Sequence, residues 1–298
     1  MVTSLLTMII LAIPGFLMRK KEMISKEQID GVGKILMNYL WPGMVLQAML
    51  SVEAEPSVLT EIQVIVIAAI AFHIGTLIFG WFYAKNRRLM AGQAPALAVC
   101  MAFSNTGLLG MPIVNSLFGA KALMLASFVE LVNDCLLFTV GISFLRGEKE
   151  RKEPFHWKQI LSPGLVSVVV GAILFVLQLD LPEVFLRVID YAGNACTAIA
   201  MFTIGGQIAE IKLDRVIRKK SLYEYSVIRL IMIPLVVCVL CLVFLRQYRL
   251  VSTVLVVMLA MPPAAVPPIL IAQYDQDYVI ATELIMMSVV GCVFTIPL

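Results

Sequence analysis

Apolar residues along this chain come in long blocks that short polar segments separate. Each block holds roughly twenty residues, the length an α-helix needs to cross the hydrocarbon core of a bilayer at ~1.5 Å per residue. The pattern therefore predicts an all-α integral membrane protein. The predicted membrane-spanning helices are residues 2–18, 29–50, 58–84, 95–118, 122–145, 159–177, 182–209, 222–245, 251–272 and 278–298.

The basic residues between these helices indicate how the chain is oriented. Lysines and arginines gather after the first, third, fifth and seventh predicted helices, whereas the opposite loops and their flanks hold only Lys121, Arg187, Arg246 and Arg249. By the positive-inside rule, the basic loops face the cytoplasm. The sequence thus predicts a multi-pass protein of the cell membrane with both termini outside the cytoplasm.

Composition supports this class and excludes others. Hydrophobic residues make up 60% of the 298 residues and charged residues 14%, well below the roughly 25% charged content of soluble domains. The net charge of +3 lies in short clusters, which favours membrane orientation over nucleic-acid binding. The six cysteines fall in apolar segments, and the chain holds two histidines and no hydrolase or zinc-enzyme motif. The sequence therefore gives no sign of a metal site, a cofactor or an enzyme.

One apolar block is interrupted by the segment SNTGLLGMPI. Asn105 and Thr106 are polar, and Gly107 weakens a helix interior. Pro112 has no N–H, so the carbonyl of Leu108 loses its helical donor. Within a membrane such a break is tolerated only where protein or a water-lined cavity supplies the missing partners. The segment therefore predicts a broken helix and a polar site at membrane depth.

A second interruption, MPPAAVPPIL, lies in the ninth predicted helix. Pro262 and Pro263 remove the donors that the carbonyls of Met258 and Leu259 would have in a continuous helix. Broken helices at corresponding places in two halves of a transporter are a pointer to its binding site. The two interruptions are therefore predicted to form one site.

The charged segment 146–158 divides the chain into two sets of five helices, 1–145 and 159–298. An odd number of helices per set inverts the second set relative to the first. Shifting the sequence by 156 residues places Pro112 over Pro268, and the hydropathy patterns of the two sets agree. These observations predict two inverted five-helix repeats joined by a short cytoplasmic linker.

Polar and ionisable residues inside the predicted helices are candidates for proton or ion coupling. The i, i+3, i+4 spacing of Glu130, Asn133 and Asp134 places them on one helix face, and two carboxylates one turn apart favour a proton on one of them. His73 and Arg229 coincide under the shift of 156 residues. The alternative interpretation is structural: a packing network for the acids, a satisfied interior histidine, and an arginine paired with a carboxylate or a free carbonyl.

Three segments carry a resemblance to a known family. They read FSNTGLLGMPIVNSLFG (Phe103 to Gly119), AGNACTAIAMFTIGGQIAEIK (Ala192 to Lys212) and AMPPAAVPPILIAQYDQD, running on to the terminal FTIPL. With these segments the whole chain resembles the auxin efflux carrier family, which includes plant auxin efflux carriers and bacterial malate and organic-acid permeases. The resemblance implies ten helices in a support part and a mobile transport part, with helices 4 and 9 crossing at unwound centres. It also implies a fold similar to that of bile-acid sodium symporters.

The resemblance assigns roles to single residues as well. Asn105 matches the family's crossover asparagine, and Pro263 lies beside the proline of the second crossover. Two features depart from the plant members: Ser104 stands where they have proline, and their long cytoplasmic loop is reduced to a short charged linker. The first departure argues against auxin as the substrate, and the second favours a minimal prokaryotic-type member.

Together these observations predict a secondary transporter that moves a small organic anion, such as a carboxylate, by alternating access at the crossover. The N-termini of the half-helices carry partial positive charge, and Asn105 offers a hydrogen bond to the anion. Two alternatives stay open on the sequence: a sodium-coupled organic-anion symporter of the bile-acid-transporter fold, and a ligand-binding membrane sensor or channel. The expected partners are the anion, the lipid bilayer and a second copy of the chain.

The candidate residues fall into two sets. The substrate-binding candidates are Ser104, Asn105, Thr106, Gly107, Pro112, Pro262, Pro263, Ala264 and Asn38. The candidates for proton or ion coupling are Glu130, Asp134, Arg229, His73 and Glu283.

Overall fold

The computed structural model describes residues 2–87, 89, 93–146, 162–179, 181–210, 220–264, 266–274 and 276–295. Nearly all of the predicted linker 146–158 and the basic segment 212–219 lie outside the described residues. Within these ranges the chain is helical and contains no strand; one isolated β-bridge joins two segments. The predicted all-α class is therefore confirmed.

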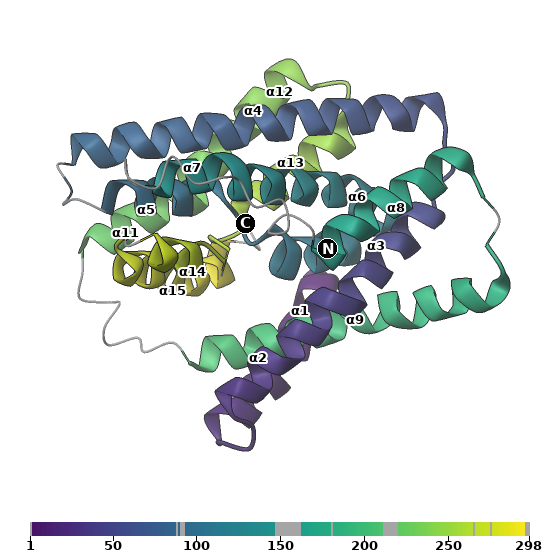
Figure 1. The fold of residues 1–298 in the computed structure, drawn as a ribbon, viewed down its shortest axis with the longest axis horizontal. Helices are drawn as coiled ribbons and strands as arrows, with labels where there is room; N and C mark the ends of the chain where they lie inside the picture. Colours follow the sequence, from purple (N-terminus) through teal and green to yellow (C-terminus); the bar gives the residue numbers. More distant parts are fainter. Residues whose placement is uncertain are drawn as a thin grey trace. The chain divides into compact units, whose positions relative to one another are not determined.

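The first half of the chain folds into helices whose bounds follow the predicted blocks (Figure 1). These elements, with η marking π-helical turns, are α1 (Val2–Lys20), α2 (Lys26–Ile35), η1 (Leu36–Leu40), α3 (Trp41–Leu50), α4 (Pro56–Asn86), α5 (Gln93–Ala102), η2 (Thr106–Gly110), α6 (Met111–Leu136), η3 (Leu137–Gly141) and α7 (Ile142–Leu145).

The second half of the chain is also helical. Its elements are α8 (Pro163–Leu177), α9 (Glu183–Ala209), α11 (Lys220–Val227), η6 (Ile228–Met232), α12 (Ile233–Phe244), α13 (Arg249–Ala260), α14 (Val266–Gln273) and α15 (Tyr278–Thr295). Four helical segments of the described chain are long and apolar enough to cross a membrane: Pro56–Asn86, Thr106–Leu145, Glu183–Ala209 and Leu222–Phe244. The number of ten spans and the inversion of the halves stay predictions.

The chain forms two compact units, and each takes segments from both predicted halves. Unit 1 comprises Met1–Val64, Gly107–Leu131 and Leu161–Ile211, and unit 2 comprises Ile65–Thr106, Val132–Ile160 and Lys212–Leu298.

Unit 1 is held together by close helix contacts in which α9 packs against both α1 and α3. A Cβ added at Gly15 of α1 would overlap the carbonyl oxygen of Phe202, and one added at Gly205 of α9 would overlap the carbonyl oxygen of Ala12. Glycines on both sides thus let the two backbones touch, as small residues do in membrane helix pairs. The side-chain amide of Gln47 on α3 donates to Asp190 of α9 at 3.0 Å.

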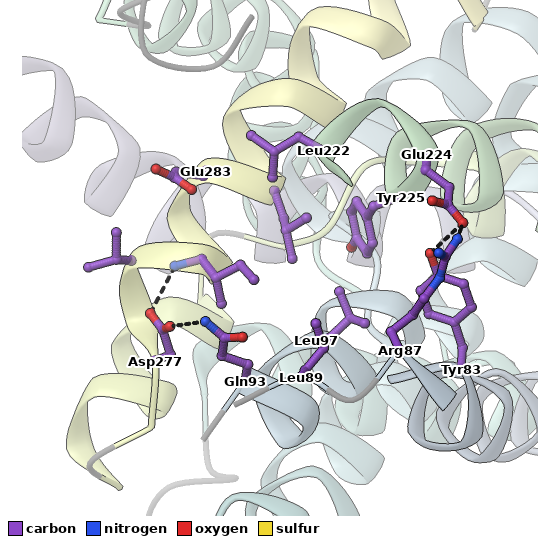
Figure 2. A pocket seen from close by; sticks show the side chains of 13 residues that line it. Tyr83, Arg87, Leu89, Gln93, Leu97, Leu222, Glu224, Tyr225, Asp277 and Glu283 are labelled. Carbon is purple, nitrogen blue, oxygen red and sulfur yellow. Dashed lines mark hydrogen bonds and ion pairs between the residues drawn. The ribbon is translucent and has the colours of Figure 1, made fainter. Parts of the chain in front are cut away.

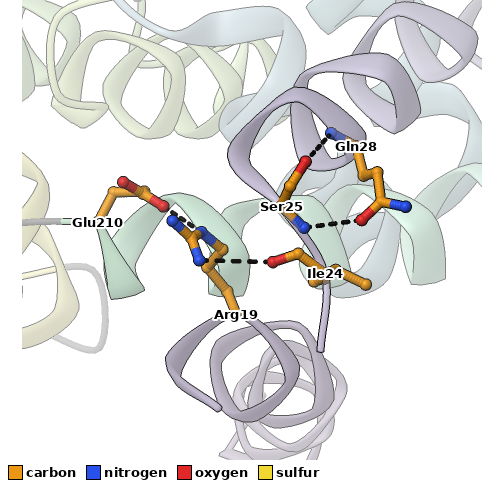
Figure 3. Close-up of polar contacts among 5 residues, drawn as sticks. All are labelled: Arg19, Ile24, Ser25, Gln28 and Glu210. Atoms are coloured by element: carbon orange, nitrogen blue, oxygen red, sulfur yellow. Dashed lines mark hydrogen bonds and ion pairs between the residues drawn. The ribbon is translucent and has the colours of Figure 1, made fainter. Parts of the chain in front are cut away.

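The ends of α1 and α9 are joined by polar contacts (Figure 3). Arg19 of α1 forms an ion pair with Glu210, the residue that follows α9. The next helix begins with a capping box: the Ser25 hydroxyl accepts the backbone N–H of Gln28, and the Gln28 side chain accepts the N–H of Ser25. The turn between α1 and α2 therefore has its free backbone donors satisfied locally.

A glycine marks the boundary predicted between the fourth and fifth membrane helices. Gly119 lies within α6 at φ 77°, a conformation that side chains other than glycine rarely adopt. It separates the helical residues 111–118 from 120–136 by a kink. The predicted boundary therefore coincides with a single kinked residue.

The first helix break lies earlier than the proline suggested. Helix α5 ends at Ala102, and the chain becomes helical again at Thr106. Pro112 is the second residue of α6, which continues without a gap from the π-helical turn η2. Its missing N–H therefore falls inside a helical segment that begins at Thr106, next to a turn where the regular i→i−4 pattern is already altered. Residues 103–105 are the break, and Pro112 does not interrupt the helix that follows.

Candidate functional site: the paired helix breaks

The two helix breaks of unit 2 pair with each other. Ser104 and Pro263 form an isolated antiparallel β-bridge. The backbone N–H of Asn105 donates to the carbonyl oxygen of Pro262 at 2.7 Å, and the N–H of Ala264 donates to the carbonyl oxygen of Phe103 at 3.2 Å. Each break thus satisfies backbone groups of the other, which removes the cost of leaving them unpaired in an apolar interior.

A buried arginine binds both breaks. Arg229 lies in η6 with its side chain 1% exposed. Its Nη1 donates to the carbonyl oxygen of Leu259 at 2.7 Å, and its Nη2 donates to the hydroxyl of Ser104. The carbonyl of Leu259 is one that the missing N–H of Pro263 leaves without its helical donor. The guanidinium therefore replaces a hydrogen bond that the proline removes.

The charge of Arg229 has no counter-ion in the described part of the chain. The ion pairs found there join other residues. Its Nε is buried and has no hydrogen-bond partner among the described residues. Burying a guanidinium at membrane depth costs at least ~2.5 kcal/mol, and one carbonyl and one hydroxyl leave its charge unpaired. Among the described residues, the guanidinium therefore keeps a buried positive charge without a carboxylate and one donor without an acceptor.

The polar side chains of the first break differ in burial and in hydrogen bonding. Asn105 is half-buried, and among the described residues its carboxamide has no hydrogen-bond partner. Thr106 is fully buried, and its hydroxyl donates to the backbone carbonyl of Ser104 at 3.4 Å. Asn105 is thus the side chain of this segment that remains available to a ligand.

The residues of the second break contribute backbone hydrogen bonds and buried apolar side chains. Pro262, Pro263 and Ala264 are all buried. Through the backbone bonds to Asn105 and Phe103 they fix the position of the first break. These three residues therefore belong to the segment that pairs with residues 103–105.

His73 lies beside the same crossing. Its ring centroid is 6.0 Å from that of Phe103. Nδ1 is 2.7 Å from the carbonyl oxygen of Ala69, so it must be the donor, and Nε2 lies 3.2 Å from the carboxamide of Asn133, which supplies the NH2 donor that a neutral imidazole needs there. Both ring nitrogens have partners, as the interior interpretation of this histidine requires. His73 and Arg229, which coincide under the shift of 156 residues, thus flank one pair of breaks.

Glu130 lies against the start of the half-helix after the first break. The side chain is 5% exposed, and a Cβ added at Gly107 would lie 2.6 Å from its Oε1. Any residue larger than glycine there would therefore displace the carboxylate. Asp134, one turn further along α6, is partly exposed.

Three predicted residues are not part of the paired segments themselves. Asn38 is exposed in η1 of unit 1, and its amide donates to the carbonyl of Lys34 in its own helix at 2.7 Å. Glu283 lines a different hollow in unit 2 (Figure 2). Pro112, in α6, follows the first break without forming part of it.

That hollow is a cavity of about 650 Å³ at the ends of α4, α5, α11 and α15. Figure 2 shows polar groups at two sides of it: Arg87 pairs with Glu224, which also accepts the Tyr83 hydroxyl at 2.9 Å, and Gln93 donates to Asp277 at 2.9 Å. Tyr225 lines the cavity with a buried hydroxyl that has no partner among the described residues.

Sequence reasoning missed Tyr225 and the pairing of Ser104 with Arg229. A signal for Tyr225 was present, because it precedes Arg229 by four residues and so shares its helix face. The link from Ser104 to Arg229 spans 125 residues and had no local signal.

Comparison with known proteins identifies the class. The family model for membrane transport proteins matches residues 1–298, the whole chain. The chain therefore belongs to this family, the auxin efflux carrier family that its motifs resemble, and it is a membrane transporter.

Relatives of the same length support the assignment. The chain is 21% identical to an uncharacterized transporter of Methanothermobacter thermautotrophicus over 298 residues, which cover 99% of this chain and 96% of the relative. It is also 21% identical to the uncharacterized transporter YfdV of Escherichia coli K12 over 315 aligned positions, which cover 99% of this chain and 95% of the relative. YfdV of Shigella flexneri is similar to the same extent.

Proposed function

We propose that this protein is a secondary transporter of a small organic anion, such as a carboxylate, and that the anion binds at the paired breaks beside Arg229. The observation that carries the proposal is the buried guanidinium of Arg229, which has an unpartnered Nε and no carboxylate partner among the described residues. An anionic substrate supplies the missing countercharge. The two oxygens of a carboxylate can accept hydrogen bonds from two N–H groups of the planar guanidinium at once, which a monatomic anion cannot do.

Asn105 completes the proposed site. Its carboxamide can donate to the second carboxylate oxygen, while its backbone N–H keeps the break in place. Ser104 orients the guanidinium, because its hydroxyl accepts from Nη2. All three side chains belong to unit 2. We therefore assign the mobile transport part to unit 2 and the support part to unit 1.

In this proposal the ten helices form two inverted repeats in the cell membrane, with both termini outside and two copies forming a homodimer. Export of a monoanion needs no coupling ion, because an interior-negative potential drives it outward by ~2.3 kcal/mol per 100 mV. Uptake needs a cation. Glu130 is our candidate proton carrier, because its carboxylate lies against Gly107, where the half-helix after the break begins.

Counterflow in proteoliposomes tests the proposal. Vesicles loaded with one of a panel of mono- and dicarboxylates should take up the same labelled acid, and Arg229→Gln should abolish this exchange while Arg229→Lys retains part of it. Exchange by Arg229→Gln at the wild-type rate would overturn the anion site. Ion conductance without exchange would indicate a channel instead.

The same vesicles separate the coupling modes. Uptake that follows an inward proton gradient and is lost in Glu130→Gln supports Glu130 as the proton carrier, with exposed Glu183→Gln as the matched control. Uptake that requires sodium at constant pH would favour a sodium-coupled symporter.

A further inference from the structure

A second hollow in unit 2 has none of the residues of the paired breaks in its lining. It has a volume of about 520 Å³ and is lined by Trp81 of α4, Ser143 and Phe144 of α7, and Arg146. The Trp81 and Phe144 rings meet edge to face with centroids 5.7 Å apart. The walls are therefore aromatic, and the guanidinium is the one charge among the described residues that line the hollow.

Arg146 is held at the edge of this hollow. It directly follows α7, and its backbone N–H donates to the carbonyl of Ile142 at 2.9 Å. Its guanidinium carbon lies 5.8 Å from the centre of the Tyr274 ring, within cation–π distance. The side-chain amide of Gln276 donates to the carbonyl oxygen of Leu145 at 3.0 Å, and this hydrogen bond fixes the end of α7.

An exposed apolar stripe leads along α4 to Trp81. Its residues share one helix face by their spacing of three or four positions, and each is more than a third exposed: Ile67 (68%), Ile70 (38%), Ile74 (38%), Ile78 (47%) and Trp81 (37%). From Ile67 to Ile78 the helix rises ~16 Å, about half of the ~30 Å hydrocarbon core. The stripe therefore has the length of one leaflet.

The two features fit one kind of ligand. Trp81 lies one turn before Lys85, at the end of α4 that the positive-inside rule places at the cytoplasmic interface. Tryptophan is enriched at that depth, and basic pockets there bind lipid headgroups. The Trp81 indole N–H has no partner among the described residues and offers a second donor beside Arg146. An anion attached to a long apolar tail matches both the charge and the stripe.

We propose that this hollow, the Trp81–Arg146 pocket, binds an anionic phospholipid of the cytoplasmic leaflet. The phosphate lies against the guanidinium of Arg146 and the indole N–H of Trp81, and an acyl chain runs along the α4 stripe. The proposal is independent of the transported substrate, because it involves none of the residues at the paired breaks.

The effect of added lipid on the melting temperature tests whether the pocket prefers an anionic headgroup. In detergent, added phosphatidylglycerol should raise the melting temperature of the protein more than phosphatidylcholine with the same acyl chains. Arg146→Gln should weaken the apparent affinity for phosphatidylglycerol about fivefold, the effect of one basic residue near a membrane surface. Arg187→Gln, which removes an exposed arginine of α9, should retain the wild-type preference. A full preference retained in Arg146→Gln would overturn the proposal.

Fluorescence quenching tests the position without altering Arg146. The chain has three tryptophans, so Trp41→Phe with Trp157→Phe leaves Trp81 as the sole emitter. Phosphatidylglycerol brominated on its acyl chains should quench Trp81 in nanodiscs more than brominated phosphatidylcholine does at the same mole fraction. Equal quenching by the two lipids would show that the pocket does not select an anionic headgroup and would reject the proposal.

Discussion

The backbone N–H of Asn105 donates to the carbonyl oxygen of Pro262 at 2.7 Å, so one interrupted helix completes the other. This bond uses only the backbone of Asn105. Its side chain is thereby held at the break while its carboxamide has no partner among the described residues. The structural and the proposed substrate-binding roles of this residue are therefore carried by different atoms and can be separated by mutation.

Replacing Asn105 by alanine should impair transport without unfolding the protein. The backbone bond to Pro262 persists, so the melting temperature should change little. Loss of one hydrogen bond to a charged ligand costs ~1.5–3 kcal/mol, so the apparent affinity for the exchanged anion should fall at least tenfold in counterflow. Asn86→Ala, at the exposed end of α4, is the matched control. Unchanged exchange by Asn105→Ala would exclude its side chain from the site.

Replacing Ser104 by alanine should destabilise unit 2. The hydroxyl accepts a hydrogen bond from the buried Arg229, and removing it leaves a further guanidinium donor unpaired. We expect a loss of ~1.5–3 kcal/mol in the free energy of unfolding. Thermal unfolding in detergent measures it. Ser51→Ala, whose exposed hydroxyl donates to a carbonyl of its own helix, should melt close to wild type. Equal melting of the two variants would argue against the buried contact.

Replacing Gly15 by alanine should separate α1 from α9. The new Cβ would overlap the carbonyl oxygen of Phe202, and backbone on both sides leaves no flexible atom to yield. Overpacking of this kind costs ~1–3 kcal/mol, which should appear as a lower melting temperature. Gly31→Ala in α2 meets nothing within 4 Å and should instead stabilise its helix by ~0.5–1 kcal/mol. The two variants should therefore shift the melting temperature in opposite directions.

Replacing Gly119 by alanine tests a backbone effect with no steric neighbour. The site has open space around an added Cβ, but its φ of 77° is costly for alanine. We expect destabilisation of ~1–2 kcal/mol. Gly75→Ala in α4 also has open space, has an ordinary helical conformation, and should be neutral or stabilising. A melting temperature for Gly119→Ala at or above that of Gly75→Ala would contradict the kink.

The sequence by itself determined the features that depend on local chemistry. Runs of apolar residues specify helices in any fold of this chain, and the lack of N–H groups at Pro262 and Pro263 interrupts one of them. Gly119 lies between two predicted helices, and a kink of this kind needs a residue free to adopt a positive φ. The orphaned carbonyl of Leu259 was likewise predictable from the proline four residues later.

Only the tertiary structure decided which distant groups meet. Residues 103–105, not the neighbourhood of Pro112, became the first break, because backbone bonds from the second break stabilise an extended segment there. The guanidinium of Arg229 donates to the carbonyl of Leu259 and to the hydroxyl of Ser104, which are 30 and 125 residues away in the sequence, and not to a carboxylate. Such pairings depend on how helices pack, and no periodicity within one helix encodes its neighbour.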